Sequence, residues 1–184
     1  MIKTKSDLYE YITADNWYYD KHYPKHDQRL FVFLHDPQYK IKKYKLYLRK
    51  EEFYLNKKGR NKINIILRLI YLRRKNKLGN KLGILIPPNT FGKGLTIMHH
   101  GEVIVNPNAR IGDYCILHGG NCIGNNGKTE DSPSIGNNVD IGIGAKIIGN
   151  VSVADNCKIG ANAVVTHSFS ESNSIIVGIP ARLK

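Results

Sequence analysis

Aliphatic residues recur at every sixth position in the second half of the chain. The strict run consists of Ile135, Ile141, Ile147, Val153, Ile159 and Val165. A small or slender residue follows each of the first five after four positions. This period suits neither a helix nor an alternating strand. It is typical of a parallel β-helix, in which three short faces form each coil and stacked coils share one core.

The same register extends upstream, with two interruptions. The upstream members are Phe91, Ile97, Ile111, Leu117 and Ile123. The interval from Val103 to Ile111 is eight residues, and the interval from Ile123 to Ile135 is twelve. The longer interval contains the polar stretch 126–133, which predicts a loop, and loops that leave a regular scaffold often carry function.

The N-terminal part of the chain predicts helices. Asp7 and Glu10 fit a capping box for a first short helix, and two further helices are expected over 41–58 and 62–77. The stretch 63–72 has eight apolar residues in ten. We expect it to pack against the solenoid or a neighbouring subunit, with contact to an anionic bilayer surface as the alternative.

Charge divides the chain near residue 82. Residues 1–81 hold 21 Lys and Arg against 8 Asp and Glu, whereas residues 82–184 hold 7 of each kind. We therefore predict a basic α-helical region over 1–81 and a β-helix domain with the loop 126–133 over 82–184. A basic tract without a recognition motif supplies only non-specific phosphate attraction, so no nucleic-acid partner is expected.

The remaining composition indicates the cellular setting. The N-terminus does not read as a secretory signal, and there is no apolar run of 18 residues, so we expect a cytoplasmic protein, with peripheral contact at the inner membrane face through the basic helices. The three cysteines are expected to be reduced, with Cys115 and Cys157 at small inward positions of the repeat. No Cys or His spacing suggests a zinc site, and no metal is expected.

Several motifs in order resemble one known family. They are the hexapeptide run, the segment Phe91-Gly92-Lys93-Gly94-Leu95-Thr96-Ile97-Met98-His99-His100, the triplet Val103-Ile104-Val105 and the ending Gly178-Ile179-Pro180-Ala181-Arg182. Over about residues 79–184 the chain resembles the left-handed β-helix acyltransferases, particularly serine acetyltransferase-like members among capsule and exopolysaccharide enzymes. The resemblance implies a mainly β fold, a left-handed parallel β-helix after an N-terminal basic α-helical region. It also implies a homotrimer with active sites between neighbouring subunits.

Two histidines are candidate catalytic residues. Acetyl transfer to a hydroxyl requires a base, and a neutral imidazole titrates in a suitable range. His99 matches the catalytic histidine of the family, although an exchange of roles with His100 stays open; His100 is expected to point away from the cleft. A regular coil takes 18 residues, and the two extra residues between Val103 and Ile111 make this coil 20 residues long. Position 99 therefore stacks on position 119, so His118 is expected beside His99 in the next coil. Three roles stay open for His118. They are binding of the acceptor, polarisation of the thioester carbonyl, and a surface position without a function.

The resemblance also implies acetyl-CoA as the acetyl donor. The coenzyme would lie along the solenoid edge, where small residues allow close approach to backbone groups. By resemblance the contact positions are Ile143, Ala161 and Thr166, and the cationic partners of the coenzyme phosphates are Lys158 and Arg182.

Departures from serine acetyltransferase proper bear on the acceptor. That enzyme has Asp where this chain has Met98, a further Asp where this chain has Ile84, and Arg-His-Pro where this chain has Asp131-Ser132-Pro133. The orienting carboxylate and the partners of a serine carboxylate are thus absent, with Glu102 as a candidate replacement. We therefore expect a sugar hydroxyl of a surface-polysaccharide precursor as acceptor, with serine as the alternative.

Two other classes share the solenoid. A γ-type carbonic anhydrase needs histidines five residues apart around a metal, and the position five after His118 is Ile123, so that class is disfavoured. A non-catalytic scaffold subunit would keep the repeat without these histidine and arginine placements.

Overall fold

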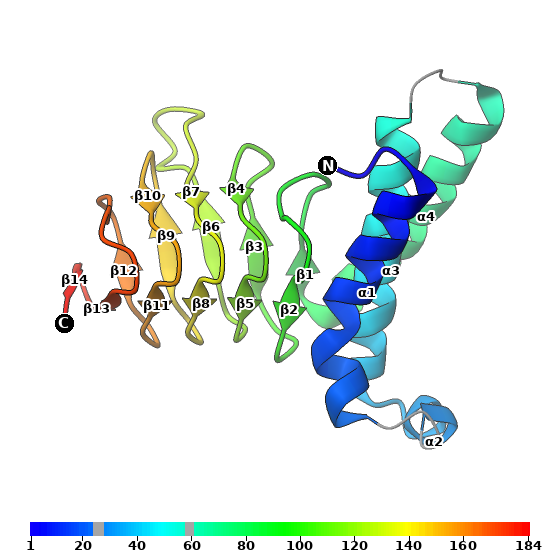
Figure 1. Ribbon diagram of the computed structural model, residues 1–184, viewed down its shortest axis with the longest axis horizontal. Helices are drawn as coiled ribbons and strands as arrows, with labels where there is room; N and C mark the ends of the chain where they lie inside the picture. Colours follow the sequence, from blue (N-terminus) through cyan, green and yellow to red (C-terminus); the bar gives the residue numbers. More distant parts are fainter. Residues whose placement is uncertain (24–27, 58–60) are drawn as a thin grey trace.

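The computed structural model describes residues 1–23, 28–57 and 61–184. Four helices precede a stack of short strands (Figure 1). The helices are α1 (Lys5–His22), α2 (Gln28–Phe33), α3 (Pro37–Asn56) and α4 (Lys62–Leu82). In the described part of the chain, no helix is long and apolar enough to cross a membrane.

The strands form three sheets that run along the stack as its three faces. One face orders the strands β1 (Ile84–Leu85), β3 (Val103–Val105), β6 (Cys122–Gly124), β9 (Lys146–Ile148) and β12 (Val164–Val165). A second face orders β4 (Arg110–Ile111), β7 (Ser134–Ile135) and β10 (Ser152–Val153). The third orders β2 (Thr96–Ile97), β5 (Ile116–Leu117), β8 (Asp140–Ile141), β11 (Lys158–Ile159), β13 (Ile175–Gly178) and β14 (Ala181–Leu183). All pairs are parallel except β13 with β14.

The six-residue repeat sets the register of the stack. Leu117 pairs with Ile97 on one side and with Ile141 on the other, and Ile159 continues the row. The aliphatic positions that the sequence assigned to the interior are buried, and so are Cys115 and Cys157. The predicted loop lies between β6 and β7 and projects from the solenoid (Figure 1).

Coil corners require backbone conformations with positive φ. Asn138 and Asn156 occupy equivalent corners at φ 55° and 60°, and the Asn138 side-chain amide donates to the Asn156 oxygen at 3.1 Å. Asparagine tolerates the left-handed region better than most residues because its short polar side chain bonds locally.

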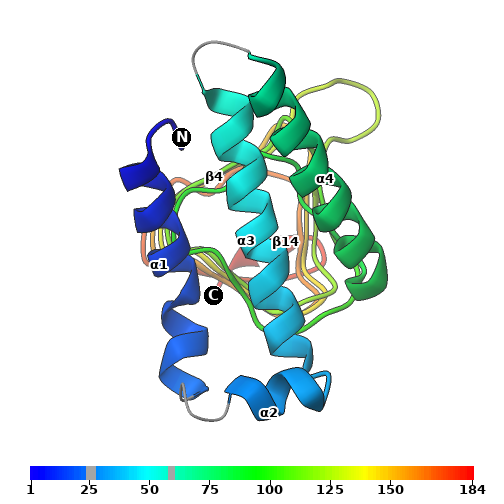
Figure 2. The same ribbon diagram turned by 90° about the vertical axis from the view of Figure 1, so that its right-hand side faces the viewer.

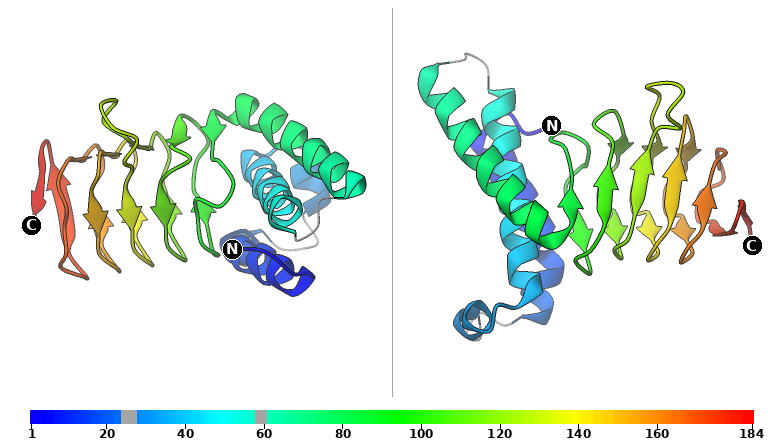
Figure 3. Two further views of the ribbon diagram at one scale, coloured as in Figure 1. Left: turned by 90° about the horizontal axis from the view of Figure 1, so that it is seen from above. Right: turned by 180° about the vertical axis from the view of Figure 1, so that it is seen from behind.

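The helices cover one end of the solenoid (Figures 2 and 3). Arg49 of α3 is fully buried. Its guanidinium donates to the carboxylates of Asp15, at 2.8 and 3.2 Å, and of Glu52, at 2.9 Å. It also donates to the backbone carbonyls of Phe91, at 3.1 Å, and Gly92, at 2.5 Å. This buried ionic cluster joins α1 and α3 to the first coil.

Three helix predictions need correction. The N-cap of α1 is Thr4 and its capping box pairs Thr4 with Asp7, so the box does not begin at Asp7, and α1 is 18 residues long. The short α2 was not predicted, and α4 continues to Leu82.

The apolar stretch of α4 does not pack against the solenoid. The residues of this stretch that are exposed are Ile63, Ile65, Ile66, Leu69 and Ile70. The solenoid-facing end of α4 instead buries Lys75, Gly79 and Leu82, because Gly79 lets the Tyr44 ring and the Ile84 backbone approach closely. The prediction of packing on the solenoid is therefore wrong for this stretch.

Candidate active site

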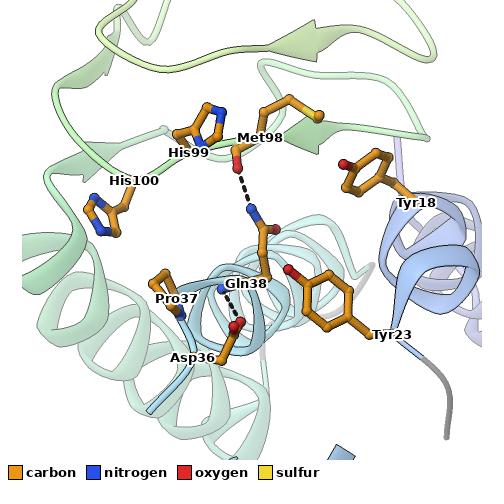
Figure 4. Close-up of a pocket in the computed structure, with 8 residues that line it drawn as sticks. All are labelled: Tyr18, Tyr23, Asp36, Pro37, Gln38, Met98, His99 and His100. Carbon is orange, nitrogen blue, oxygen red and sulfur yellow. Dashed lines mark hydrogen bonds between the residues drawn. The ribbon is translucent and has the colours of Figure 1, made fainter. Parts of the chain in front are cut away.

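The chain turns after β2, and this turn carries Met98, His99 and His100. Both histidines are exposed, and they line a cavity of about 300 Å³ between the first coil and the helices (Figure 4). The described residues that complete the lining are Tyr18, Tyr23, Asp36, Pro37, Gln38 and Met98. The cavity therefore receives both histidines, whereas the sequence favoured His99 alone.

The helical wall of the cavity is tied to the histidine turn. The Gln38 side-chain amide donates to the carbonyl oxygen of Met98, the residue before His99. Asp36 caps α3, because its Oδ1 accepts from the backbone N–H groups of Gln38 at 2.7 Å and Tyr39 at 3.2 Å. Sequence reasoning missed this wall, since Gln38 and Met98 are 60 positions apart and share no periodic signal.

Asp36 places a carboxylate beside Tyr23 on the helical side of the cavity. Burial raises the pKa of Tyr23, and the neighbouring Asp36 carboxylate raises it further. Tyr23 therefore stays a neutral hydroxyl that can donate a hydrogen bond at neutral pH.

His118 lies one coil below the His99 turn, as the repeat arithmetic predicted. Ile97 pairs with Leu117, so His99 is in register with Gly119, and a Cβ on Gly119 would lie 3.5 Å from the Cβ of His99. His118 Nε2 is 2.8 Å from Oδ1 of Asp140, and both side chains are about one third exposed.

Asp140 is a site residue that sequence reasoning missed. It precedes the inward Ile141 and points outward from the coil that follows His118. The strand register could have revealed Asp140. Position 140 pairs with position 116, which lies two residues before His118 on the outward side of the inward Leu117. A carboxylate partner for an imidazole is thus present in this chain, although it serves His118.

One solenoid edge collects three of the residues singled out from the sequence. His99, Ile143 and Ala161 occupy equivalent positions in their coils, with Gly119 between His99 and Ile143. Backbone bonds continue along this edge, from Gly144 N to Gly119 O at 2.9 Å and from Asn162 N to Ile143 O at 2.8 Å. Ile143 and Ala161 are exposed, so a ligand arm along this edge can reach them from His99.

The other three predicted coenzyme residues lie apart from this edge. Lys158 is exposed on the adjoining face, where its Cα pairs with that of Asp140. Thr166 follows β12 and occupies the next corner of the coil. Arg182 lies in β14 beside a surface cavity of about 490 Å³ that His167 and Glu171 also line.

Glu102 is the candidate replacement for the lost carboxylate, and Ser132 lies in the loop at which the sequence departs from serine acetyltransferase. Glu102 is exposed and is not among the described residues that line the cavity, so the structure gives no support for it as the replacement carboxylate. In the loop, the Ser132 hydroxyl donates to the Glu130 carbonyl at 3.3 Å. Over residues 1–23, 28–57 and 61–184, no group of three or more His, Cys, Asp or Glu could hold a metal ion.

Stacked coils built from six-residue repeats, with a histidine cavity at one end, are typical of the β-helix transferases. A family model described as bacterial transferase hexapeptide (six repeats) matches residues 132–167. In its repeat and in its named relatives the chain is similar to the left-handed β-helix, hexapeptide-repeat acyltransferases.

Relatives of known name point to one activity. The chain is 38% identical over 104 residues to a serine acetyltransferase of Synechococcus elongatus and 40% identical over 104 residues to one of Staphylococcus xylosus. Each match covers 55% of this chain, but only 42% and 48% of the relatives' own length. The chain thus spans about half the length of the curated relatives it matches.

Solved structures extend the likeness to the helices. Soybean serine acetyltransferase complexed with serine has a TM-score of 0.73 at 26% identity, covering 98% of this chain and 70% of that chain. Serine acetyltransferase of Neisseria gonorrhoeae in complex with serine has a TM-score of 0.67 at 25% identity, with the same coverage.

These comparisons correct the predicted acceptor. The loss of the family's aspartates and of its Arg-His-Pro loop favoured a sugar hydroxyl of a polysaccharide precursor. The named relatives at 38% and 40% identity are serine acetyltransferases, so that prediction is wrong and the alternative is better supported. The sequence argument considered only the lost side chains, and it left out the helices outside the repeat, which also line the cavity.

Proposed function

We propose that this protein transfers an acetyl group from acetyl-CoA to the hydroxyl of L-serine. The observation that carries the proposal is the position of His99, in a cavity at the head of the exposed edge that leads to Ile143 and Ala161. Such an arrangement can hold a small acceptor at one end and a long thioester donor along the edge.

In the proposed reaction His99 is the general base. Its neutral imidazole takes the proton of the serine hydroxyl while the hydroxyl oxygen bonds to the thioester carbonyl carbon. The tetrahedral intermediate then expels the thiolate, the carbon–sulfur bond breaks, and the imidazolium returns the proton to the leaving sulfur. Gln38 holds the peptide that precedes His99 and so fixes the direction of this imidazole.

His118 and Asp140 form the second part of the proposed site. The carboxylate oxygen 2.8 Å from Nε2 fixes the orientation of the His118 ring. Held in this way, His118 would help to position the acceptor beside the His99 turn.

The donor is proposed to lie along the solenoid edge. Ile143 and Ala161 would contact the amide-bearing arm, whose polar groups pair with exposed backbone groups of the corner residues. Lys158 and Arg182 would bind the coenzyme phosphates, and Thr166 would contact the donor from the next corner.

We also propose a homotrimer in which residues 82–184 carry the catalytic site and residues 1–81 supply its helical wall. The exposed side chains of Leu85 and Ile104 support an interface on the face of β1, because they are in register and 56% and 48% exposed. Size-exclusion chromatography with light scattering measures the mass; a monomer at micromolar concentration would contradict this assembly.

The proposed activity is tested by following thiol release from acetyl-CoA with purified full-length protein. Release that depends on L-serine and stops in His99→Ala is the expected result. Acetyl-CoA binding without serine-dependent release would overturn serine as the acceptor. The absence of both acetyl-CoA binding and thiol release would indicate a non-catalytic scaffold.

A further inference from the structure

A groove between α3 and α4 is lined by cations and lies outside the proposed acetyl-transfer site. Its volume is about 220 Å³, and its lining consists of Lys43, Tyr47, Arg74, Lys77, Leu78 and Lys81. The two residues from α3 are one turn apart, and the four from α4 follow a single stripe of that helix. Figure 2 shows the two helices side by side across the end of the solenoid.

The four cations of the groove carry no neutralising carboxylate. No Asp or Glu occurs in α4, and α3 contains only Glu51 and Glu52. Glu51 bonds the buried Lys75 at 2.7 Å, and Glu52 bonds Arg49 at 2.9 Å, so both are engaged elsewhere. No ion pair between described residues includes any of the four groove cations.

The lysines of these helices thus fall into two groups. Lys45 and Lys75 are buried, and each donates to a backbone carbonyl of the solenoid end. Lys43, Lys77 and Lys81 are exposed around a hollow and repel one another. The first group joins the helices to the first coil, whereas the second forms no ion pair with a described residue.

Aromatic rings hold two of the cations in place without consuming their donors. Lys43 Nζ lies 4.8 Å from the centre of the Tyr39 ring, and the Arg74 guanidinium lies 5.9 Å from that of Tyr71. Tyr47 and Leu78 complete the lining. Four of the six side chains that line the groove therefore carry a positive charge.

We infer that this groove binds a phosphate group. A phosphate dianion matches several neighbouring cations better than a single carboxylate does, and arginine can bind it through two parallel hydrogen bonds. The groove is smaller than typical pockets for whole small-molecule ligands, so it takes one phosphate or a diphosphate, with any remainder outside. The groove is separate from the edge proposed for acetyl-CoA, which runs through Ile143 and Ala161 on later coils.

The test uses full-length protein and sodium pyrophosphate at constant ionic strength, with chloride as the compensating anion. Isothermal titration and thermal unfolding report binding, since a ligand of the folded state raises its melting temperature. A parallel arm uses vesicles of phosphatidylcholine with and without phosphatidylglycerol. Binding in the first arm indicates a free phosphate compound, and binding only in the second indicates a lipid headgroup.

Two double variants with the same loss of charge separate the groove from net charge. K77Q/K81Q removes two groove cations, and K3Q/K5Q removes two exposed lysines near the start of α1. All four lysines are exposed, so both variants are expected to fold. We expect K77Q/K81Q to weaken phosphate binding about tenfold or more, and K3Q/K5Q to change it less than about twofold.

Three results would overturn the inference. They are equal loss in the two double variants, equal stabilisation by chloride and pyrophosphate, and no groove-dependent binding in either arm. A raised KM for acetyl-CoA in K77Q/K81Q would also overturn it, since the groove would then belong to the donor site. Because binding is measured without turnover, a failure of the proposed acetyl transfer leaves these outcomes readable.

Discussion

His99 is positioned by two elements that are distant in the sequence. The repeat places it at a coil corner above Gly119, and Gln38 of α3 bonds the carbonyl of the residue before it. A catalytic imidazole must be held near its productive direction, because small displacements cost large factors in rate. In the proposed reaction the helical wall would therefore contribute to the chemistry as well as to the shape of the cavity.

Substitution of His99 by alanine is expected to lower kcat for serine acetylation by about 10² to 10⁴, the usual contribution of a general base. The matched comparison is His100→Ala, which changes the neighbouring imidazole at the same cavity and should cost less than about tenfold. Steady-state thiol release measures both. A larger loss in His100→Ala would assign the base to His100.

Asp140→Asn keeps a hydrogen-bond acceptor beside His118 but removes its charge. We expect kcat/KM to fall about tenfold, as for a lost charge-assisted hydrogen bond of roughly 1.4 kcal/mol. Glu10→Gln, which changes an exposed carboxylate paired with Lys93, is the control and should leave kcat/KM unchanged. Equal values for the two variants would remove Asp140 from the site.

At the scale of elements, the repeat was predictable and the helix docking was not. A six-residue period fixes which side chains point inward, so Ile141 and Ile159 were placed correctly, and coil arithmetic predicted the register of position 99 with position 119. Hydropathy placed 63–72 of α4 in a core, but the docking face of that helix lies at Lys75 and Gly79. A docking face that consists of buried charged groups has no hydrophobic periodicity in the sequence, so this face of the helix could not be predicted from hydropathy.

The buried cluster that docks the helices predicts a large difference between two aspartates of α1. Asp15→Ala leaves Arg49 buried without its partner and should lower the free energy of unfolding by about 3 to 5 kcal/mol. Asp20→Ala removes a half-exposed partner of Lys42 and should cost less than about 1 kcal/mol. Denaturant unfolding measures both, and similar values would show that the cluster does not dock the helices.

At the scale of the whole molecule, Lys45 links stability to pH. Burial lowers its pKa to about 8 from the ordinary 10.5, although the Asp15 charge opposes this. Between these pH values the unfolded chain binds the proton more readily, so stability rises with pH, by up to about 1.4 kcal/mol per pH unit. Above about pH 10 the trend reverses, because the buried Tyr44 and Tyr19 also have raised pKa values.

The measurement is the free energy of unfolding from pH 7 to 10, in the wild type and in Lys45→Met. The variant lacks the titrating group and should show a flatter curve between pH 8 and 10. Parallel curves for the two proteins would mean that Lys45 keeps an ordinary pKa in the folded state.

The contacts of Arg49 and Lys45 with the first coil also decide how long the solenoid can grow. The carbonyls of Phe91, Gly92 and Leu95 that accept from these cations, and the Leu95 N–H that donates to Asp15 at 2.9 Å, face away from the second coil. These are the backbone groups to which a further strand, from another molecule, would add. The helices therefore prevent end-to-end polymerisation into fibres at this end, and at the other end the antiparallel β14 interrupts the parallel register.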